Sequence, residues 1–190
     1  MPSILILGIG NAILSDEGVG VHVVRQFQSR DAGPDVRVLD GGTLSFTLAP
    51  EIENADGLIV VDAAQLAAPA GTVRVFIGDA MDRFVGTGRR SVHEVSLLDL
   101  LDIARLTGTL PAQRALVAIQ PDRLDWGCTL SPAVADSVSA ATQEVHRLLD
   151  VFRQTARKRP VALPSRSRSG RRSAAASPIR GDLLCDPTNG

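Results

Sequence analysis

The chain has 190 residues, of which 44% are hydrophobic, and its mean hydropathy is +0.11. This is enough apolar material for one domain with a buried core. No run approaches the roughly 20 apolar residues that span a bilayer, and the amino terminus lacks the basic region and cleavage site of a signal peptide. We therefore expect a cytoplasmic protein without a membrane partner. Its two cysteines, Cys128 and Cys185, form no CxxC pair, which argues against a cysteine-built zinc site.

The net charge of -1 hides an uneven distribution along the chain. Nine of the 20 Lys and Arg residues lie at or beyond Arg153, where only Asp182 and Asp186 oppose them. Residues 1–152 are net acidic, which predicts a folded domain that binds no nucleic acid. Residues 153–190 are rich in Arg, Ser, Ala and Pro and poor in apolar residues, so we expect them to form a basic, disordered tail.

Short β-branched runs alternate with longer amphipathic segments, which is typical of βα units and a mostly parallel sheet. The expected strands span residues 3–9, 36–40, 57–62, 72–77 and 114–120. The expected helices span residues 17–30, 45–54, 94–105 and 132–152. Because the first, third and fifth strands are continuously apolar, helices are expected to cover both faces of the sheet. The pattern therefore predicts an α/β fold.

An acidic residue or a Gly-rich turn follows each of the first three strands. Glu17 lies beyond the first loop, Asp40 ends the second strand and Asp62 ends the third. The carboxyl ends of parallel strands meet at one edge of an open sheet, where ligands usually bind. We therefore expect these three carboxylates to face one crevice.

The first loop leaves a nucleotide-binding module open as an alternative. Residues 8–10 read Gly-Ile-Gly, but Ile13 stands where a dinucleotide fingerprint needs its third glycine. Asp40 would be the ribose-binding carboxylate. Asp16 and Glu17 argue against this alternative, because two carboxylates beside the phosphate site would repel a pyrophosphate. They are also explained as acidic residues that complement a helix dipole.

His93 follows a Gly-rich, basic loop at residues 85–92 and is expected to open the next helix. The run from His93 to Leu97 nearly matches the HExxH zinc-protease motif, but Leu97 replaces the second histidine. An isolated histidine here is also explained as a surface or capping residue. Serine and cysteine hydrolases are not indicated, since no GxSxG elbow occurs and Cys128 has no neighbouring base in a known motif.

Five motifs occur in a fixed order along the chain: Gly8-Ile9-Gly10-Asn11, Asp16-Glu17-Gly18-Val19-Gly20, Asp40-Gly41-Gly42-Thr43, Val60-Val61-Asp62-Ala63 and Ser91-Val92-His93. With these motifs the chain resembles the nickel-iron hydrogenase maturation endopeptidases over roughly residues 3–150. The resemblance implies a doubly wound, three-layer α/β/α sandwich with a five-stranded, mostly parallel sheet. It also implies an enzyme that removes the carboxy-terminal extension of the nickel-loaded precursor of a hydrogenase large subunit, with nickel as recognition element.

Carried over by motif, the resemblance makes Glu17, Asp62 and His93 the metal-contacting and catalytic residues. Two carboxylates and an imidazole suit nickel, zinc or iron and leave coordination positions open. The nickel would be held by the precursor, and the metal would polarise the scissile carbonyl or activate a water. Either carboxylate is a candidate general base. The alternative is a non-catalytic metallochaperone or assembly checkpoint that binds the same precursor.

The resemblance also implies that Asp40, Gly41, Gly42 and Thr43 face the substrate. Glycines at this position would let the backbone approach a bound peptide closely. A strand-to-helix turn with Thr43 as helix cap explains the same residues without any substrate.

Overall fold

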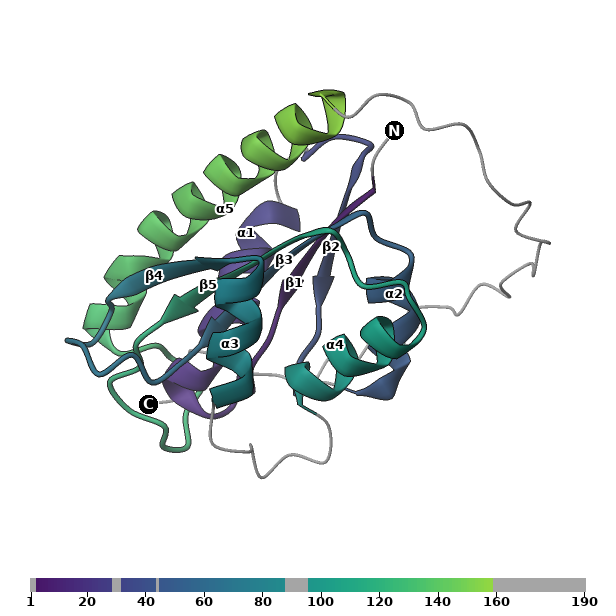
Figure 1. The fold of residues 1–190 in the computed structure, drawn as a ribbon. Helices are drawn as coiled ribbons and strands as arrows, with labels where there is room; N and C mark the ends of the chain where they lie inside the picture. Colours follow the sequence, from purple (N-terminus) through teal and green to yellow (C-terminus); the bar gives the residue numbers. More distant parts are fainter. Residues whose placement is uncertain (1–2, 29–31, 44, 88–95, 159–190) are drawn as a thin grey trace.

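The computed structural model describes residues 3–28, 32–43, 45–87 and 96–158 (Figure 1). They contain a five-stranded sheet with the order β2-β1-β3-β5-β4. The strands are β1 Ile4–Gly8, β2 Val36–Asp40, β3 Gly57–Ala63, β4 Val73–Ile77 and β5 Gln113–Ile119. β4 is antiparallel to β5 at one edge, and the other pairs are parallel. The expected α/β fold with a mostly parallel sheet is thereby confirmed.

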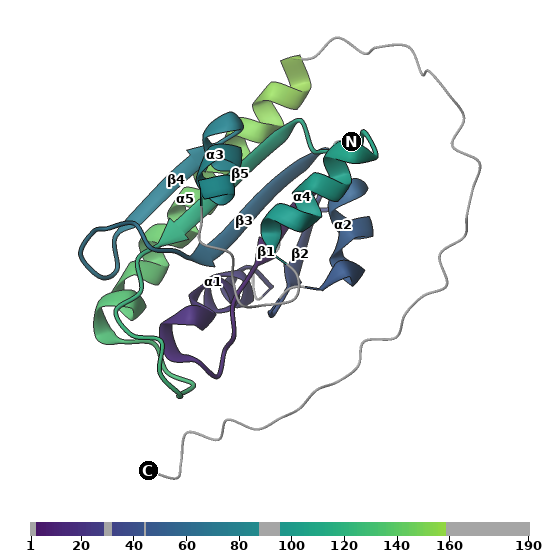
Figure 2. The same ribbon diagram turned by 60° about the horizontal axis from the view of Figure 1, so that its bottom comes forward.

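Helices cover both faces of this sheet. Two short 3-10 helices, η1 Ser15–Gly18 and η2 Phe46–Leu48, lead into α1 Val19–Gln28 and α2 Ala49–Glu53. The other helices are α3 Asp79–Thr87, α4 Leu97–Leu106 and α5 Pro132–Lys158. α1 and α5 pack on one face and α2, α3 and α4 on the other, as Figure 1 and Figure 2 show. The result is the expected three-layer sandwich.

β1 shows how the apolar runs produce this layering. Ile4 and Ile6 pack into the core under α1 and α5, whereas Leu5 and Leu7 pack into the core under α2 and α4. Successive side chains of a strand point to opposite faces, so a strand that is apolar at every position needs a layer on each side. The two edge strands, β2 and β4, have no fully buried residue.

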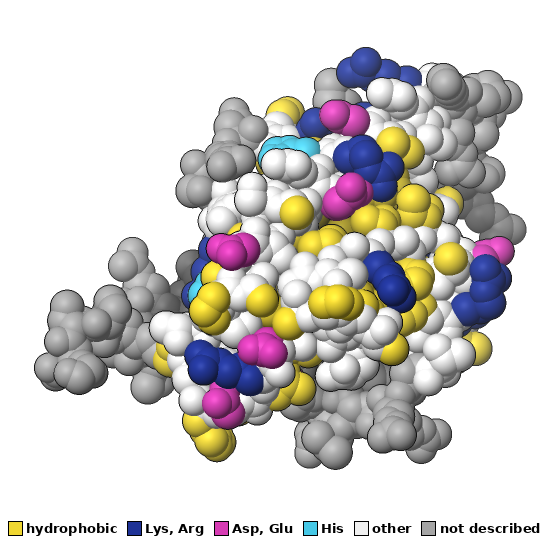
Figure 3. Space-filling view, turned by 90° about the vertical axis from the view of Figure 1, so that its left-hand side faces the viewer, with side chains coloured by type: hydrophobic (Ala, Val, Ile, Leu, Met, Phe, Trp, Pro, Cys, Tyr) yellow, Lys and Arg dark blue, Asp and Glu magenta, His cyan; other side chains and the backbone are white. Residues whose placement is uncertain are grey.

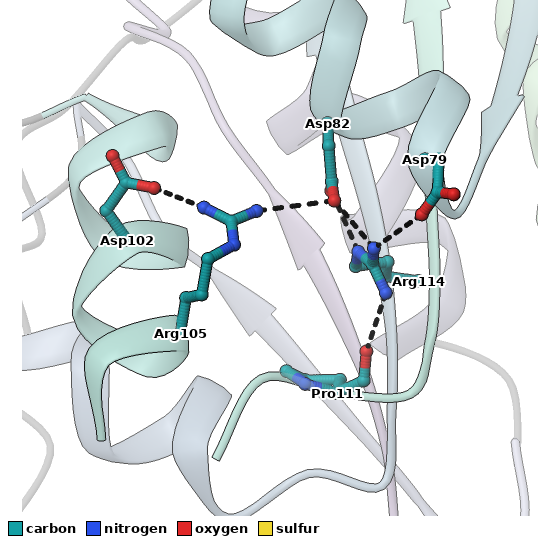
Figure 4. Close-up of polar contacts among 6 residues, drawn as sticks. All are labelled: Asp79, Asp82, Asp102, Arg105, Pro111 and Arg114. Atoms are coloured by element: carbon teal, nitrogen blue, oxygen red, sulfur yellow. Dashed lines mark hydrogen bonds and ion pairs between the residues drawn. The ribbon is translucent and has the colours of Figure 1, made fainter. Parts of the chain in front are cut away.

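Helix α3 is absent from the elements expected from the sequence. Met81 is its one fully buried residue, and Phe84 and Val85 pack beside it on the same core. Ion pairs add to this packing: Arg114 of β5 donates to Asp82 at 2.8 and 2.6 Å and to Asp79 at 3.3 Å, as Figure 4 shows. Arg105 of α4 donates to the same Asp82 at 3.3 Å. These contacts tie α3 and α4 to the sheet.

Two element boundaries differ from the expected ones. α4 begins at Leu97 rather than at residue 94, because Ser96 caps it in a reciprocal capping box with Asp99. His93, the residue expected to open this helix, lies outside the described residues. None of the helices in the described parts of the chain is long and apolar enough to cross a membrane.

The other difference concerns the end of the domain. α5 continues to Lys158, beyond the expected domain end at residue 152. Arg153 donates to both carboxylate oxygens of Asp35 at 2.8 and 2.7 Å, and this paired geometry anchors the end of the helix. Residues 153–158 thus belong to the folded domain, while the rest of the expected tail, residues 159–190, lies outside the described residues.

Candidate active site

The carboxyl ends of β1, β2 and β3 lie side by side at one edge of the sheet. Gly8, the last residue of β1, is paired with Asp40 on β2 and with Val61 on β3. Asp62 is therefore one residue beyond the level at which β1 ends. The chain then turns from β1 into η1, which carries Glu17. The parallel topology thus gathers residues from three separate segments at this edge.

Two glycines allow the η1–α1 segment to lie directly on the strand ends. A Cβ atom on Gly20 would stand 2.2 Å from the carbonyl oxygen of Val61 and 2.4 Å from that of Ile9. A Cβ atom on Gly10 would stand 1.8 Å from the carbonyl oxygen of Glu17. Gly10 also has a φ of +132°, which side chains rarely allow. The close approach fixes Glu17 at the edge.

Asp62 has an unusual protonation equilibrium at this edge. Burial raises its pKa to about 7, with the backbone N–H of Ala63 acting in the opposite direction and the negative charge of Glu17 raising the pKa further. η1, which carries Glu17, contacts β3, which carries Asp62, so the two carboxylates lie at the same edge of the sheet. Asp62 can gain or lose a proton near neutral pH.

Asp40 is at the same edge but is exposed and faces α1. Its carboxylate accepts a hydrogen bond from Arg25 of α1 at 3.3 Å and another from the backbone N–H of Gly42 at 3.1 Å. Thr43 is exposed and is not a helix cap, because the side chain of Ser45 caps η2. The capping explanation of Thr43 is therefore wrong.

Backbone hydrogen bonds tie the 40–43 segment to the first loop. Gly41 donates its N–H to the carbonyl of Gly8 at 2.8 Å, and Gly10 donates to the carbonyl of Gly42 at 2.9 Å. Gly42 has a φ of +49°, in the left-handed region. The segment therefore forms a fixed wall of main chain beside the turn that leads to Glu17.

The sequence predicts only that Asp16 lies in the first turn of a helix, and the structure shows a further role for it. Its fully buried side chain accepts hydrogen bonds from the backbone N–H groups of Asp122, Arg123 and Ser131 and from the Ser131 hydroxyl, at 2.6 to 3.0 Å. Burial alone would raise the pKa of Asp16, but these four bonds outweigh it and lower the pKa. Asp16 thus fastens the loop after β5 to the turn that carries Glu17.

His93 lies outside the described residues, so its place in the site stays a prediction. Within the parts of the chain that the structure describes, no three His, Cys, Asp or Glu side chains form a group that could hold a metal ion. Glu17 and Asp62 are the two candidate ligands that the described residues bring together.

Solved structures with this fold define the class of protein. The hydrogenase-maturating endopeptidase HybD from E. coli matches with a TM-score of 0.73 and 32% identity, over 80% of this chain and 93% of that one. The [NiFe] hydrogenase maturation protease HybD from Thermococcus kodakarensis matches with a TM-score of 0.66 and 26% identity, over 77% of this chain and 99% of that one. The fold is that of hydrogenase maturation endopeptidases.

Sequence relatives lead to the same family. A family model described as hydrogenase maturation protease matches residues 21–148. The hydrogenase expression/formation protein HupD of Bradyrhizobium diazoefficiens is 36% identical over 167 residues, which cover 87% of each chain. The hydrogenase 2 maturation protease of Escherichia coli is 34% identical, over 75% of this chain and 87% of its own length. The chain therefore belongs to the hydrogenase maturation protease family and is a hydrolase with an endopeptidase role in hydrogenase maturation.

Proposed function

We propose that this protein removes the carboxy-terminal extension from the nickel-loaded precursor of a nickel-iron hydrogenase large subunit, and that it recognises the nickel carried by that precursor. The observation that supports the proposal is the position of Glu17 and Asp62 at one edge of the sheet. These carboxylates come from different segments, the carboxyl ends of parallel strands are where ligands usually bind, and the charge of Glu17 raises the pKa of Asp62.

The chemistry of the pair fits a divalent cation. Burial and the charge of Glu17 both disfavour ionisation of Asp62. A cation between the two carboxylates would reverse this effect, since an opposite charge stabilises the ionised form. With His93 as the third donor, the set suits nickel and leaves positions for ligands from the precursor. The three side chains would then test for nickel without extracting it from the substrate.

Asp62 is the candidate general base of the hydrolysis. A base acts best when its pKa is near the working pH, and the pKa of Asp62 is about 7 without a metal, so this role belongs to Asp62 once it is freed from the metal. Asp62 would take a proton from the water that attacks the scissile carbonyl carbon, and would return it to the leaving amine as the C–N bond breaks. When bound, the metal would supply Lewis acidity at the carbonyl or at the water. Glu17 is the second carboxylate and holds the charge that helps to set this pKa.

The 40–43 segment is the candidate binding wall for the peptide around the cleaved bond. Its two glycines, Gly41 and Gly42, lack side chains that would keep a peptide away from the main chain. Hydrogen bonds to Gly8 and Gly10 hold the wall in place. Asp40 and Thr43 are exposed and add polar groups that an incoming peptide can meet.

The test is intact-mass spectrometry of a cognate large-subunit precursor incubated with the protein. We expect loss of one carboxy-terminal peptide from the nickel-loaded precursor and no change in the nickel-free precursor. Glu17→Gln, Asp62→Ala and His93→Ala should each abolish the cleavage. Glu144→Gln, which changes a carboxylate on α5 far along the chain from the site, should leave it unchanged.

Other outcomes would contradict the proposal in distinct ways. Equal cleavage of nickel-free and nickel-loaded precursor would show that nickel is not the recognition element. Normal cleavage by Asp62→Ala would show that the assigned site is wrong. Tight, nickel-dependent binding of the precursor without any change in its mass would instead favour the assembly checkpoint, which uses the same three residues.

A further inference from the structure

Three large apolar side chains are exposed around the loop after β5, residues 121–131. Trp126, Leu124 and Ile13 keep 79%, 52% and 48% of their surface exposed. Trp126 and Leu124 belong to the loop, and Ile13 belongs to the turn between β1 and η1. None of the three contributes to the two hydrophobic cores of the described residues. We refer to these three residues as the apolar platform.

The platform is built on two segments that hydrogen bonds join. Gly127 donates its N–H to the carbonyl of Ile13 at 3.0 Å and accepts the N–H of Ser15 at 2.8 Å. The Ser15 hydroxyl donates to the Asp125 carboxylate at 2.8 Å. Asp16 holds the loop from beneath through its buried carboxylate. Groups that are already ordered lose less conformational entropy on binding, so this platform is prepared to receive a partner.

The platform and the 40–43 segment flank the carboxylate pair on opposite sides. The 40–43 segment begins at the end of β2, the loop follows β5, and the strands β1 and β3 of the site lie between them. Figure 1 and Figure 2 both draw the green loop beside the purple η1, which carries Glu17. A protein substrate that places a peptide bond at Glu17 and Asp62 therefore has the platform beside it.

Charged side chains surround the apolar ones. Asp122, Arg123 and Asp125 belong to the same loop and are exposed, and Arg123 lies 3.7 Å from Asp125. In Figure 3, the lower end of the molecule carries hydrophobic side chains next to charged ones of both signs. An exposed tryptophan with apolar neighbours and a polar rim is the usual composition of a protein-binding hot spot.

We propose that the apolar platform docks the folded body of the large-subunit precursor, through an apolar pocket on that protein that receives the indole of Trp126. This rests on the proposed function and names a second contact between enzyme and substrate, separate from the cleaved peptide. The platform carries no group that titrates or binds a metal, so it contributes to affinity and not to bond breaking. Trp126 is accordingly a residue that determines specificity.

The kinetic test compares Trp126→Ala with a matched control. Leu106 is 89% exposed and lies at the end of α4. The next residue, Thr107, contacts Glu53, so Leu106 is at the edge of the sheet opposite the site. For Trp126→Ala we expect a rise in KM of about 10-fold with kcat within about 2-fold. Trp126→Phe should restore most of the affinity, and Leu106→Ala should change neither constant. An unchanged KM in Trp126→Ala, or an equal effect of Leu106→Ala, would overturn the proposal.

A binding measurement can follow Trp126 directly, because it is the single tryptophan of the chain. Full-length protein labelled with 5-fluorotryptophan gives one fluorine resonance by NMR. We expect unlabelled precursor and the processed large subunit to shift it, and a synthetic peptide of the extension to leave it unchanged. A shift caused by the peptide alone would show that the platform binds the extension and not the body.

The same fluorine resonance tests whether another part of the chain or a second copy of the protein covers the apolar platform. In the free protein it should show the solvent-isotope shift of an exposed indole at every concentration. Protection at all concentrations would mean that the chain covers its own platform, and protection that grows with concentration would mean a second copy, so either result overturns the proposal.

The proposed function and the docking proposal can be refuted independently. Cleavage of a cognate precursor without a shift overturns the docking alone, whereas a shift without cleavage retains the docking and overturns the proposed function.

Discussion

Replacing Asp62 with asparagine is expected to stabilise the fold at pH 8 while it abolishes processing. The ordinary pKa of this carboxyl is 3.8 and its pKa in the folded protein is about 7. Between these values the folded state binds a proton that the unfolded state lacks, so the free energy of unfolding falls as the pH rises. One proton corresponds to about 1.4 kcal/mol per pH unit. From pH 5 to pH 8 the wild type should therefore lose about 2 to 3 kcal/mol from this group.

The side-chain amide of the Asp62→Asn variant does not titrate, so the variant should escape this loss. Urea unfolding of both proteins at pH 5 and pH 8, with the two-state midpoint and slope, gives the comparison. The advantage of Asp62→Asn over the wild type should grow by about 2 to 3 kcal/mol between the two pH values. Glu144→Gln, which changes a half-buried carboxylate on α5, should show no such growth. A difference between wild type and Asp62→Asn that is the same at both pH values would refute the reasoning.

Three further predictions concern the framework of the site. Asp16→Asn leaves one backbone donor facing an amide, and urea unfolding at pH 7 should show a loss of about 2 to 3 kcal/mol; because the pKa of Asp16 is lowered in the folded state, this deficit should shrink as the pH falls from the ordinary pKa of 3.8 toward the lower pKa of the folded protein. Gly20→Ala places a Cβ atom 2.2 Å from a carbonyl oxygen and should lower the melting temperature sharply, whereas Gly86→Ala in α3, with open space around it, should raise it slightly. Arg153→Ala should reduce stability by about 1 to 2 kcal/mol in the same urea assay, and Arg157→Ala, on the exposed side of the helix end, should not.

The strands were predictable because each forms a short apolar run that can be recognised in the local sequence. The apolar runs of β1, β3 and β5 identify strands that are covered on both faces, and the structure has them within one or two residues of the expected bounds. Helix α3 could not be recognised in this way. Its apolar stripe is short, Met81, Phe84 and Val85, and its ion-pair partner Arg114 lies 32 positions beyond Asp82 and reaches it only in the folded sheet.

The candidate site was likewise predictable from the sequence only in part. The order of the motifs led to Glu17 and Asp62, and the parallel topology brings them together. The role of Asp16 was hidden, because its hydrogen-bond partners lie more than 100 residues further along the chain. From the sequence, Asp16 and Glu17 are two neighbouring acids at a helix start, and nothing distinguishes the one that is buried from the one at the site. The place of His93 stays a prediction.

The reversed direction of β4 determines how the chain reaches β5. Ile77, the last residue of β4, is paired with Ala115 near the start of β5, so the chain leaves one strand and enters the other at the same edge, remote from Glu17 and Asp62. The connection therefore has to go out and come back, as α3 and α4 do. A parallel β4 would need a single crossover helix. The reversal gives the chain one additional pair of helices, and the two helix ends that face each other along the chain, at Thr87 and Leu97, lie away from the edge at which β4 ends.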